Sequence, residues 1–311
     1  MSKGIPPAEV RIDVDLVRAL LRAQHPDLAD EELEVAGHGW DCVMVRIGAE
    51  RAARLPRRAF AAPLAEVEQR WLPQLAPRLP IPVPVPLRVG EPGEGYPWPW
   101  TIVPWFPGVS LDCTSLDERA AVPLANFLVA LHHPAPDDAP LNSWRGVPLA
   151  GRADAFHGWM ADLRARPDGL SPTLAAAVDQ VWNEAVAEPI DVAPTWLHGD
   201  LHPRNVIARD GMIAAIIDWG DVCTGDRATD LASLWTLLPT ATARDDARRV
   251  LELEAGISPS TWARAKGWAA FFGAILFVAG LDDGDVPFAD AGRATLERVA
   301  GDVDGCGRDV R

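Results

Sequence analysis

The sequence predicts an α+β protein of two lobes, in which a small antiparallel-sheet lobe with one main helix precedes a larger, mostly helical lobe. Short apolar segments between Gly- or Pro-containing turns occupy much of residues 33–103, as expected for antiparallel strands. From residue 116 onward, apolar residues recur mostly at helical spacing. Because 311 residues exceed the usual size of one domain, we assign residues 1–104 to the first lobe and residues 105–311 to the second.

The first lobe is predicted to begin with a helix and to continue mainly as strands. Asp13 is a suitable N-cap for a helix that ends near His25. The main helix begins at Pro63, since proline suits the first turn of a helix. Prolines that alternate with aliphatic residues at 79–86 predict an extended connector, because proline has no N–H to donate within a helix. The expected strands are residues 33–35, 42–47, 51–55, 87–89 and 98–103.

The second lobe is predicted to consist mostly of helices, the first of which Asp117 can cap. The most apolar segment, residues 268–281, is too short to cross a bilayer, so we expect a buried helix there and no membrane association. The expected helices are residues 117–131, 150–166, 171–187, 226–238, 241–255, 258–281 and 285–300.

The most informative segment is residues 196–232. It contains Asp200, then Asn205, and then Asp218 after a predicted hairpin within residues 206–217. The hairpin has a tight Asp-Gly turn, and it is expected to carry Asp218 back beside Asn205. Transfer of a phosphoryl group requires a carboxylate beside the attacking hydroxyl. It also requires an amide oxygen and a second carboxylate that hold magnesium against the nucleotide phosphates. The spacing therefore predicts phosphoryl transfer.

Each of these residues also has a simpler interpretation. His198 and His202 are four positions apart, as in some zinc sites, but the glycine and proline around them prevent the helix that this spacing requires. Asp200 alone is compatible with a turn, and Asp218 alone with the end of a strand. The joint spacing, and no single residue, favours phosphoryl transfer.

The segment resembles a known enzyme family. An Asp followed after four residues by Asn, and then by Asp-aromatic-Gly, is the pattern of the kinase catalytic loop and metal site. With Leu201-His202-Pro203 in the loop and Asp230-Leu231-Ala232 downstream, the chain is more similar to the aminoglycoside phosphotransferase family than to the protein kinases. The resemblance extends over about residues 33–238. It implies a bilobal, protein-kinase-like fold with a nucleotide-binding N-lobe and a catalytic C-lobe.

The resemblance implies a role for each residue of the segment. Asp200 is the expected catalytic residue, which accepts or orients the proton of the substrate hydroxyl. Asn205 and Asp218 are the expected ligands of Mg²⁺. His198 is expected to brace the loop, and Asp230 is expected to brace it by accepting backbone N–H groups.

Nucleotide-binding residues are expected in the first lobe. Arg54 takes the place of the lysine that a kinase-like third strand normally supplies to the phosphates. We expect Glu68 to orient Arg54 through an ion pair, with Glu66 as the alternative. Gly37 and Gly39 lie at a strand-to-strand turn, where glycine lets backbone amides approach phosphates.

Two further positions follow from the resemblance. The backbones of Pro104 and Phe106 are expected to contact the adenine edge, through the carbonyl of Pro104 and the N–H of Phe106. Arg204 stands where the family usually has glycine. Its side chain is expected at the mouth of the cleft, where it would repel a cationic substrate or contact a phosphate.

The composition narrows the choice of partners. The chain has 29 Lys and Arg against 44 Asp and Glu, a net charge of −15, which excludes nucleic acid as a partner because phosphate binding needs a basic face. An acidic cleft would favour a polycationic acceptor, whereas an apolar cleft would favour a macrolide. The acids that could line such a cleft are Asp221, Asp226, Asp282, Asp283 and Asp285.

The sequence also indicates a compartment. Cys42, Cys113, Cys223 and Cys306 form no C-x-x-C pair, and residues 1–15 contain no apolar run of a signal peptide. We therefore expect reduced cysteines and a cytoplasmic protein.

Together these observations predict an O-phosphotransferase that uses ATP, with GTP as the alternative nucleotide, and Mg²⁺. It would move the γ-phosphate to a hydroxyl of a small molecule. An antibiotic of the aminoglycoside or macrolide type is the first expectation, which would make the protein an antibiotic-resistance enzyme. A metabolic kinase of the choline, homoserine or fructosamine sort is the alternative. A nucleotide-binding regulator without turnover is a third hypothesis. The oligomeric state stays open.

Overall fold

The computed structural model describes residues 7–304. The chain forms two compact units: Met1–Pro107 with Ala215–Gly220, and Gly108–Ala214 with Asp221–Arg311. The segment with Asp218 thus belongs to the first unit, whereas the boundary drawn from the sequence places it in the second. The assignment of nucleotide binding to residues 1–104 and of catalysis to residues 105–311 stays a prediction.

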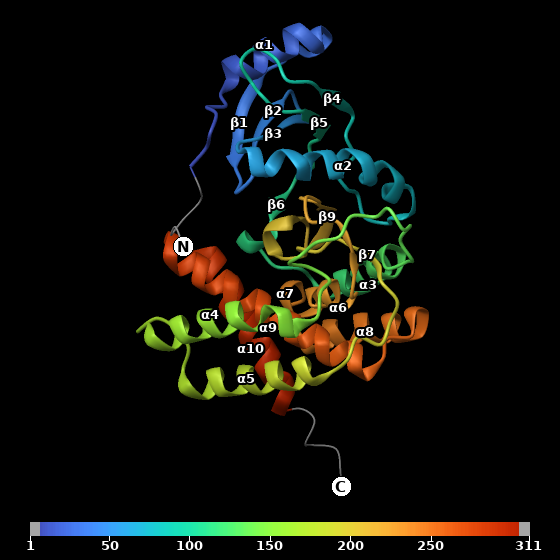
Figure 1. The fold of residues 1–311 in the computed structure, drawn as a ribbon, viewed down its shortest axis with the longest axis vertical. Helices are drawn as coiled ribbons and strands as arrows, with labels where there is room; N and C mark the ends of the chain where they lie inside the picture. The colour runs from blue at the N-terminus through green and yellow to red at the C-terminus, as the bar shows by residue number, and fades with distance from the viewer. Residues whose placement is uncertain (1–6, 305–311) are drawn as a thin grey trace. The chain divides into compact units, whose positions relative to one another are not determined.

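The first unit is built on a five-stranded antiparallel sheet (Figure 1). The strand order is β1-β2-β3-β5-β4. The expected glycine loop begins later than predicted, because the first strand continues through Gly37 to His38 after a bulge. The strands are β1 (Leu33–His38), β2 (Cys42–Ile47), β3 (Arg51–Pro56), β4 (Arg88–Gly90) and β5 (Trp100–Pro104).

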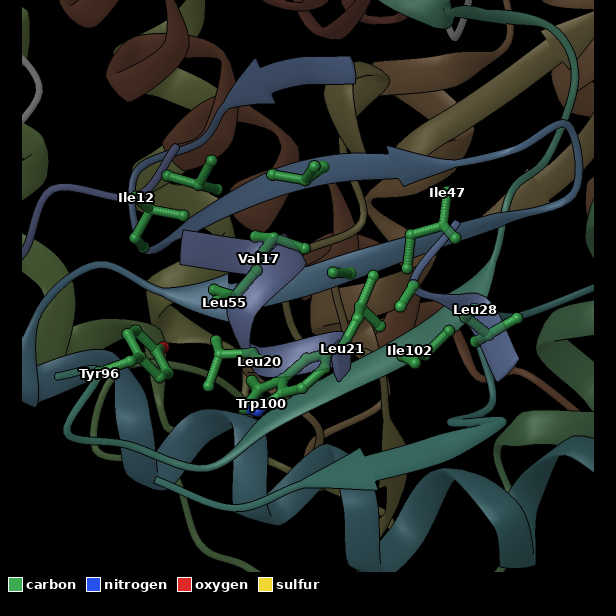
Figure 2. Packing of buried hydrophobic residues seen from close by; sticks show 14 residues of the cluster. Ile12, Val17, Leu20, Leu21, Leu28, Ile47, Leu55, Tyr96, Trp100 and Ile102 are labelled. Atoms are coloured by element: carbon green, nitrogen blue, oxygen red, sulfur yellow. The ribbon is translucent and has the colours of Figure 1, made fainter. Parts of the chain in front are cut away.

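Helix α1 (Val14–Gln24) packs on one face of this sheet. Its N-cap is Asp13, whose side chain accepts the N–H of Leu16 at 3.0 Å. Figure 2 shows the resulting core, in which Leu20 and Leu21 lie against side chains of β2, β3 and β5. Since successive side chains of a strand point to opposite faces, β3 directs Leu55 into this core and Arg54 to the other face.

Helix α2 (Ala62–Leu75) is the main helix of the unit and begins with the expected proline in its first turn. It buries Glu68 and Trp71, whereas Glu66 is exposed. Short 3₁₀ turns flank it on both sides, at Ala59–Ala61 and Ala76–Arg78.

The second unit is mostly helical. Ser171, Thr240 and Ser258 cap its helices, and each side chain accepts the N–H of the residue three positions later. The helices are α3 (Ala121–Leu131), α4 (Ala153–Ala165), α5 (Pro172–Ala187), α6 (Ala228–Leu231), α7 (Ser233–Leu237), α8 (Ala241–Ala255), α9 (Pro259–Asp283) and α10 (Val286–Asp304). Together with the sheet of the first unit, they agree with the predicted α+β class.

Helix α9 forms the centre of this unit and contacts α4, α5, α6 and α10. The helix α9 has 25 residues, close to the predicted 258–281, and so extends beyond the apolar segment 268–281. Among the described residues it is the one helix with the length and composition of a membrane span, but 72% of its most apolar window is buried within the structure. The expected buried helix is therefore confirmed.

Two small sheets carry the segment of interest. Strand β7 (Thr195–Leu197) pairs antiparallel with β10 (Cys223–Gly225). A second sheet has the order β6-β8-β9, with β6 (Val109–Ser110), β8 (Val206–Arg209) and β9 (Met212–Ile216). The turn between β8 and β9 is the expected one, because Asp210 and Gly211 both have positive φ, 52° and 74°.

Three of the cysteines, Cys42, Cys113 and Cys223, are free thiols. Cys306 lies outside the described residues.

Candidate active site

In the first unit, Arg54 brings two carboxylates together. Arg54 is 9% exposed and donates to Oε2 of Glu68, and its Nη2 donates to Oδ1 of Asp218 at 2.8 Å. Glu68 reaches Arg54 from the buried face of α2. The exposed Glu66, the alternative considered from the sequence, makes no such contact within the described residues. The guanidinium of Arg54 thus binds both Glu68 of α2 and Asp218, which lies 164 positions after Arg54 in the chain.

Within this cluster, the pKa of Glu68 is shifted. Burial raises the pKa of Glu68 to about 7, against the opposing positive charge of Arg54. Glu68 therefore titrates close to neutral pH, and its ionised form is the one that attracts the guanidinium.

Asp218 occupies an unusual backbone conformation. Its φ is 60°, in the left-handed region that aspartate tolerates better than most residues. The next residue, Trp219, is fully buried, and its Nε1 donates to the carbonyl of Ile216 at 3.0 Å. Ile216 in turn donates its N–H to the carbonyl of Pro82 at 3.0 Å. These bonds hold the turn, and the carboxylate of Asp218 stays half exposed, with 55% of its side chain accessible.

In the second unit, the loop after β7 is held by Asp230. This carboxylate is fully buried and accepts the main-chain N–H of His198 at 2.7 Å and that of Gly199 at 2.9 Å. Nε2 of His132 lies 3.3 Å from the same carboxylate. Gly199 has φ = 86°, and a Cβ atom there would lie 2.6 Å from the carbonyl oxygen of Asp221, so the position requires glycine.

Asp200 lies in this loop, and three side chains contact its oxygen atoms. Its Oδ1 accepts from Nη2 of Arg145 at 2.7 Å, and its Oδ2 lies 3.2 Å from Nε2 of His202. Asn205 donates its Nδ2 to the main-chain oxygen of Asp200 at 2.8 Å. Burial alone would raise the pKa of Asp200, but Arg145 and His202 hold that pKa well below its ordinary value. The carboxylate is therefore ionised at neutral pH.

The two histidines of the loop are oriented by backbone amides. Nδ1 of His198 accepts the N–H of Asp200 at 3.2 Å, and Nδ1 of His202 accepts the N–H of Arg204 at 3.3 Å. In its neutral form, His202 therefore carries its proton on Nε2, the atom that faces Asp200. In the described part of the chain, no three His, Cys, Asp or Glu side chains are grouped closely enough to bind a metal ion.

The donor set proposed for magnesium is chemically suitable in each unit. The hydrogen bonds that fix the carboxamide of Asn205 use its nitrogen, which leaves its oxygen Oδ1 for a cation. Asp218 offers a half-exposed carboxylate, of which Arg54 binds one oxygen. Amide and carboxylate oxygens are the ligands that Mg²⁺ takes.

The acids expected to line an acceptor site are neutralised by arginines. Asp226 is 2% exposed, and both of its oxygens accept from Arg264, so it closes an internal ion pair and offers no atom to an acceptor. Asp221 accepts from Asn142 at 2.7 Å and lies 3.8 Å from Arg145.

Arg204 does not project as a free cation. It donates to Asp112 and to Asp285, and its guanidinium lies 3.9 Å from the ring centroid of Phe288. Asp282 pairs with Arg166 in the same way. The acidic side chains of this region therefore present less negative charge than the composition implies.

The remaining nucleotide-binding candidates belong to the first unit. Gly37 pairs with Met44 within the sheet, and the N–H of Gly39 donates to the carbonyl of Cys42 at 2.8 Å. Pro104 ends β5 opposite Arg51, and Phe106 is half-buried two residues later. None of these contacts tests a role in nucleotide binding, so that role stays a prediction.

Arg145 is the site residue that sequence reasoning missed. It lies in an irregular segment 55 positions before Asp200, with no motif around it. An arginine between a tryptophan and a glycine carries no recognisable signal, so only the folded chain shows that it contacts Asp200.

Known proteins of similar sequence or fold are phosphotransferases. The family described as "Phosphotransferase enzyme family" matches residues 32–268. A solved aminoglycoside 2'-phosphotransferase-IIIa in complex with GDP has a TM-score of 0.66 at 19% identity, over 92% of this chain and 98% of that one. The macrolide 2'-phosphotransferase MphH from Brachybacterium faecium has a TM-score of 0.57 at 23% identity, over 91% and 97%. These likenesses confirm the predicted kinase-like fold class.

A match to a metabolic enzyme is shorter. A homoserine kinase of Gluconacetobacter diazotrophicus is 36% identical over 89 residues. This match covers 25% of the chain and spans only about a quarter, 26%, of the length of that kinase.

Proposed function

The chain belongs to the phosphotransferase enzyme family and is a phosphotransferase, and on this premise we propose that it transfers the γ-phosphate of ATP or GTP to a hydroxyl of a small molecule. The observation that carries the proposal is the state of Asp200. Its carboxylate contacts Arg145 and His202, on a loop whose backbone Asp230 fixes, and these contacts favour its ionised form. An ionised carboxylate in this position is suited to accept a hydrogen bond from a substrate hydroxyl and so to orient it for attack.

The other site residues have supporting roles in this proposal. Asn205 and Asp218 are the residues that would hold Mg²⁺, which would neutralise charge on the phosphates. Arg54 binds the α- and β-phosphates, and Glu68 keeps its guanidinium in place. Phosphoryl transfer needs little covalent help from the protein, so these residues act mainly by positioning and by charge.

Two classes of acceptor are supported by different observations. The solved relatives of similar fold are named as aminoglycoside and macrolide phosphotransferases, which favours a hydroxylated antibiotic. The homoserine kinase match favours a small metabolite. The pairing of Asp226 with Arg264 and of Asp285 with Arg204 leaves little free negative charge for a polycation, so it favours the second class over an aminoglycoside.

The charge, the burial of α9 and the free cysteines bear on the partners and the compartment of the enzyme. The net charge of −15 disfavours nucleic acid as a partner. Helix α9 is mostly buried, and the three described cysteines are free, in line with a cytoplasmic enzyme without membrane association.

Replacement of Asp200 by Asn tests the proposal, with Asp210→Asn as the matched control. Asp210 is an exposed loop aspartate, and asparagine also tolerates its left-handed conformation. With Mg²⁺ and a panel of hydroxylated antibiotics and metabolites, the wild type and Asp210→Asn should consume ATP. Asp200→Asn should lose about 10²- to 10⁴-fold in kcat and still bind ATP in a calorimetric titration. Full turnover by Asp200→Asn would contradict the assignment. ATP binding without turnover in the wild type would favour a regulator.

A further inference from the structure

The segment between α3 and α4 places Arg145 beside Asp200 in a fixed way. Oδ1 of Asn142 accepts the N–H of Trp144 at 2.8 Å and that of Arg145 at 3.2 Å. On the other side, Gly146 donates to Oγ1 of Thr229 at 3.2 Å. Because backbone bonds hold both neighbours, the position of Arg145 is built into the fold.

Arg145 is only partly satisfied by the acids it contacts. One of its nitrogens, Nη2, donates to Asp200, and its guanidinium lies 5.3 Å from the ring centroid of Phe272. Its Nε is buried without a hydrogen-bond partner. A buried donor without an acceptor is unfavourable, so this side chain retains the capacity to bind an anion.

Arg152 lies next to Arg145 and packs against two aromatic rings. It belongs to the 3₁₀ turn Leu149–Arg152, is 9% exposed, and lies 4.7 Å from the ring centroid of Trp144 and 5.0 Å from that of Phe271. The rings contact the guanidinium but accept none of its in-plane N–H groups, and its Nε is buried without a partner.

No acid neutralises Arg152 within the described residues. Burial first, and then the positive charge of Arg145, lower the pKa of Arg152. The two arginines also share one wall, because their rings, Phe271 and Phe272, are consecutive on α9 with centroids 6.0 Å apart. Among the described side chains, Arg152 is a buried cation without an acid, and Arg145, although it is paired with Asp200 and lies near Asp221, also has an unpaired donor. An anionic ligand would stabilise such an arrangement.

We propose that Arg145 and Arg152 form an anion-binding subsite beside Asp200, and that the acceptor is a small hydroxyl compound which carries a carboxylate or similar anionic group. This inference rests on the proposed function, because it assumes that the acceptor hydroxyl binds at Asp200. A planar guanidinium binds a carboxylate through two parallel N–H bonds, so the pair would hold the acceptor in one orientation. Trp144, which is 59% exposed, offers an apolar surface to the remainder of the acceptor.

The test compares acceptors that differ only in the anionic group. The pairs are L-homoserine with its amide, and 4-hydroxybutanoate with 4-hydroxybutanamide, each assayed with MgATP. The wild type should prefer the acid. Arg152→Met should lower the acid-to-amide ratio of kcat/KM by about 10- to 100-fold, the size expected for hydrogen bonds to a charged group. Arg152→Lys, which keeps the charge but not the planar fork, should retain part of the preference.

Arg248→Met is the matched control. Arg248 also lies over a tryptophan of the second unit, 5.0 Å from the ring centroid of Trp262, but on α8 and with Glu252 as its ion-pair partner. The acid-to-amide ratio of this variant should equal that of the wild type.

A binding measurement decides the inference even without turnover. The acids, but not the amides, should raise the thermal unfolding midpoint of the wild type, and Arg152→Met should lose this shift. Equal shifts with acid and amide would overturn the proposal. So would an equal fall of kcat/KM for both in Arg152→Met, since the anion would then be the transferred phosphoryl group.

The two proposals fail separately. If an antibiotic such as kanamycin is phosphorylated with the same efficiency by the wild type and by Arg152→Met, the anionic subsite is refuted while the phosphotransferase assignment stands. If Asp200→Asn retains full turnover, the assignment of Asp200 itself fails.

Discussion

The carboxylate of Asp230 accepts the main-chain N–H of His198 at 2.7 Å, from 32 positions further along the chain. It also accepts the N–H of Gly199, so two buried backbone donors depend on one side chain. The geometry of the loop that carries Asp200 therefore depends on a residue outside the loop.

Loss of this carboxylate should weaken both stability and turnover. In Asp230→Ala, two buried N–H groups lose their acceptor, and the free energy of unfolding should fall by about 2–4 kcal/mol. Urea denaturation followed by tryptophan fluorescence measures this change, and kcat should fall in parallel. Asp179→Asn, at a surface ion pair with Arg164, serves as the control and should change stability by less than about 1 kcal/mol. A stable and fully active Asp230→Ala would show that the loop is held by other contacts.

Two glycines with positive φ should respond differently to alanine. At Gly256 (φ = 56°) the space around a new Cβ is open, so Gly256→Ala should cost only the conformational strain, about 1–2 kcal/mol. At Gly199 the Cβ would also lie 2.6 Å from the carbonyl oxygen of Asp221, so Gly199→Ala should lose at least ~3 kcal/mol and most of its activity. Denaturation of the two variants side by side isolates the clash. Equal losses would mean that the loop can relax around the new methyl group.

The orientation of Arg54 should depend on Glu68 and not on Glu66. Glu68→Gln removes the negative charge that holds the guanidinium, so the KM for ATP should rise about 10-fold. Glu66→Gln changes an exposed acid of the same helix and should leave the KM unchanged. Initial rates over a range of ATP concentrations compare the two. A larger effect of Glu66→Gln would require another account of how Arg54 is held.

The pKa of about 7 at Glu68 also predicts how stability changes with pH. The pKa is raised above its ordinary value of 4.5, so the folded chain binds this proton more tightly than the unfolded chain. The contribution to stability is complete below about pH 4.5 and is lost as the pH rises through 7. Relative to Glu68→Gln, the wild type should therefore lose stability over this range, on the order of 3 kcal/mol. Chemical denaturation at pH 5, 6, 7 and 8 measures the difference, and a flat difference would contradict the raised pKa.

Much of the arrangement follows from local sequence signals. The Asp-Gly turn of the β8–β9 hairpin, the N-cap Asp13 and the start of α2 at a proline each depend on residues close together in the chain, and the structure contains all three. The other expected cap, Asp117, makes no side-chain capping bond, and a short 3₁₀ turn precedes α3 there. The contact of Asp230 with the loop backbone was inferred from a family resemblance, because no local pattern links residues so far apart.

Other features depend on tertiary packing and carry no local signal. The bond from Arg145 to Asp200 requires the irregular segment after α3 to fold against the loop. Asp226 was expected among the acids of an acceptor cleft, but it is buried in an ion pair with Arg264 of α9, a contact that only the folded chain brings about. Gly37 was expected in a turn, but pairing with Met44 extends the strand beyond the bulge.

The assignment of Ala215–Gly220 to the first unit has a practical consequence for protein engineering. Arg54 takes one of its carboxylate partners from this insert, which the chain delivers only after about half of the second unit has been synthesised. A chimera joined once, near Pro107, would transplant the sheet without that acid. Exchange of the whole sheet unit between homologous enzymes would need three crossover points, with the six-residue insert grafted together with the N-terminal part.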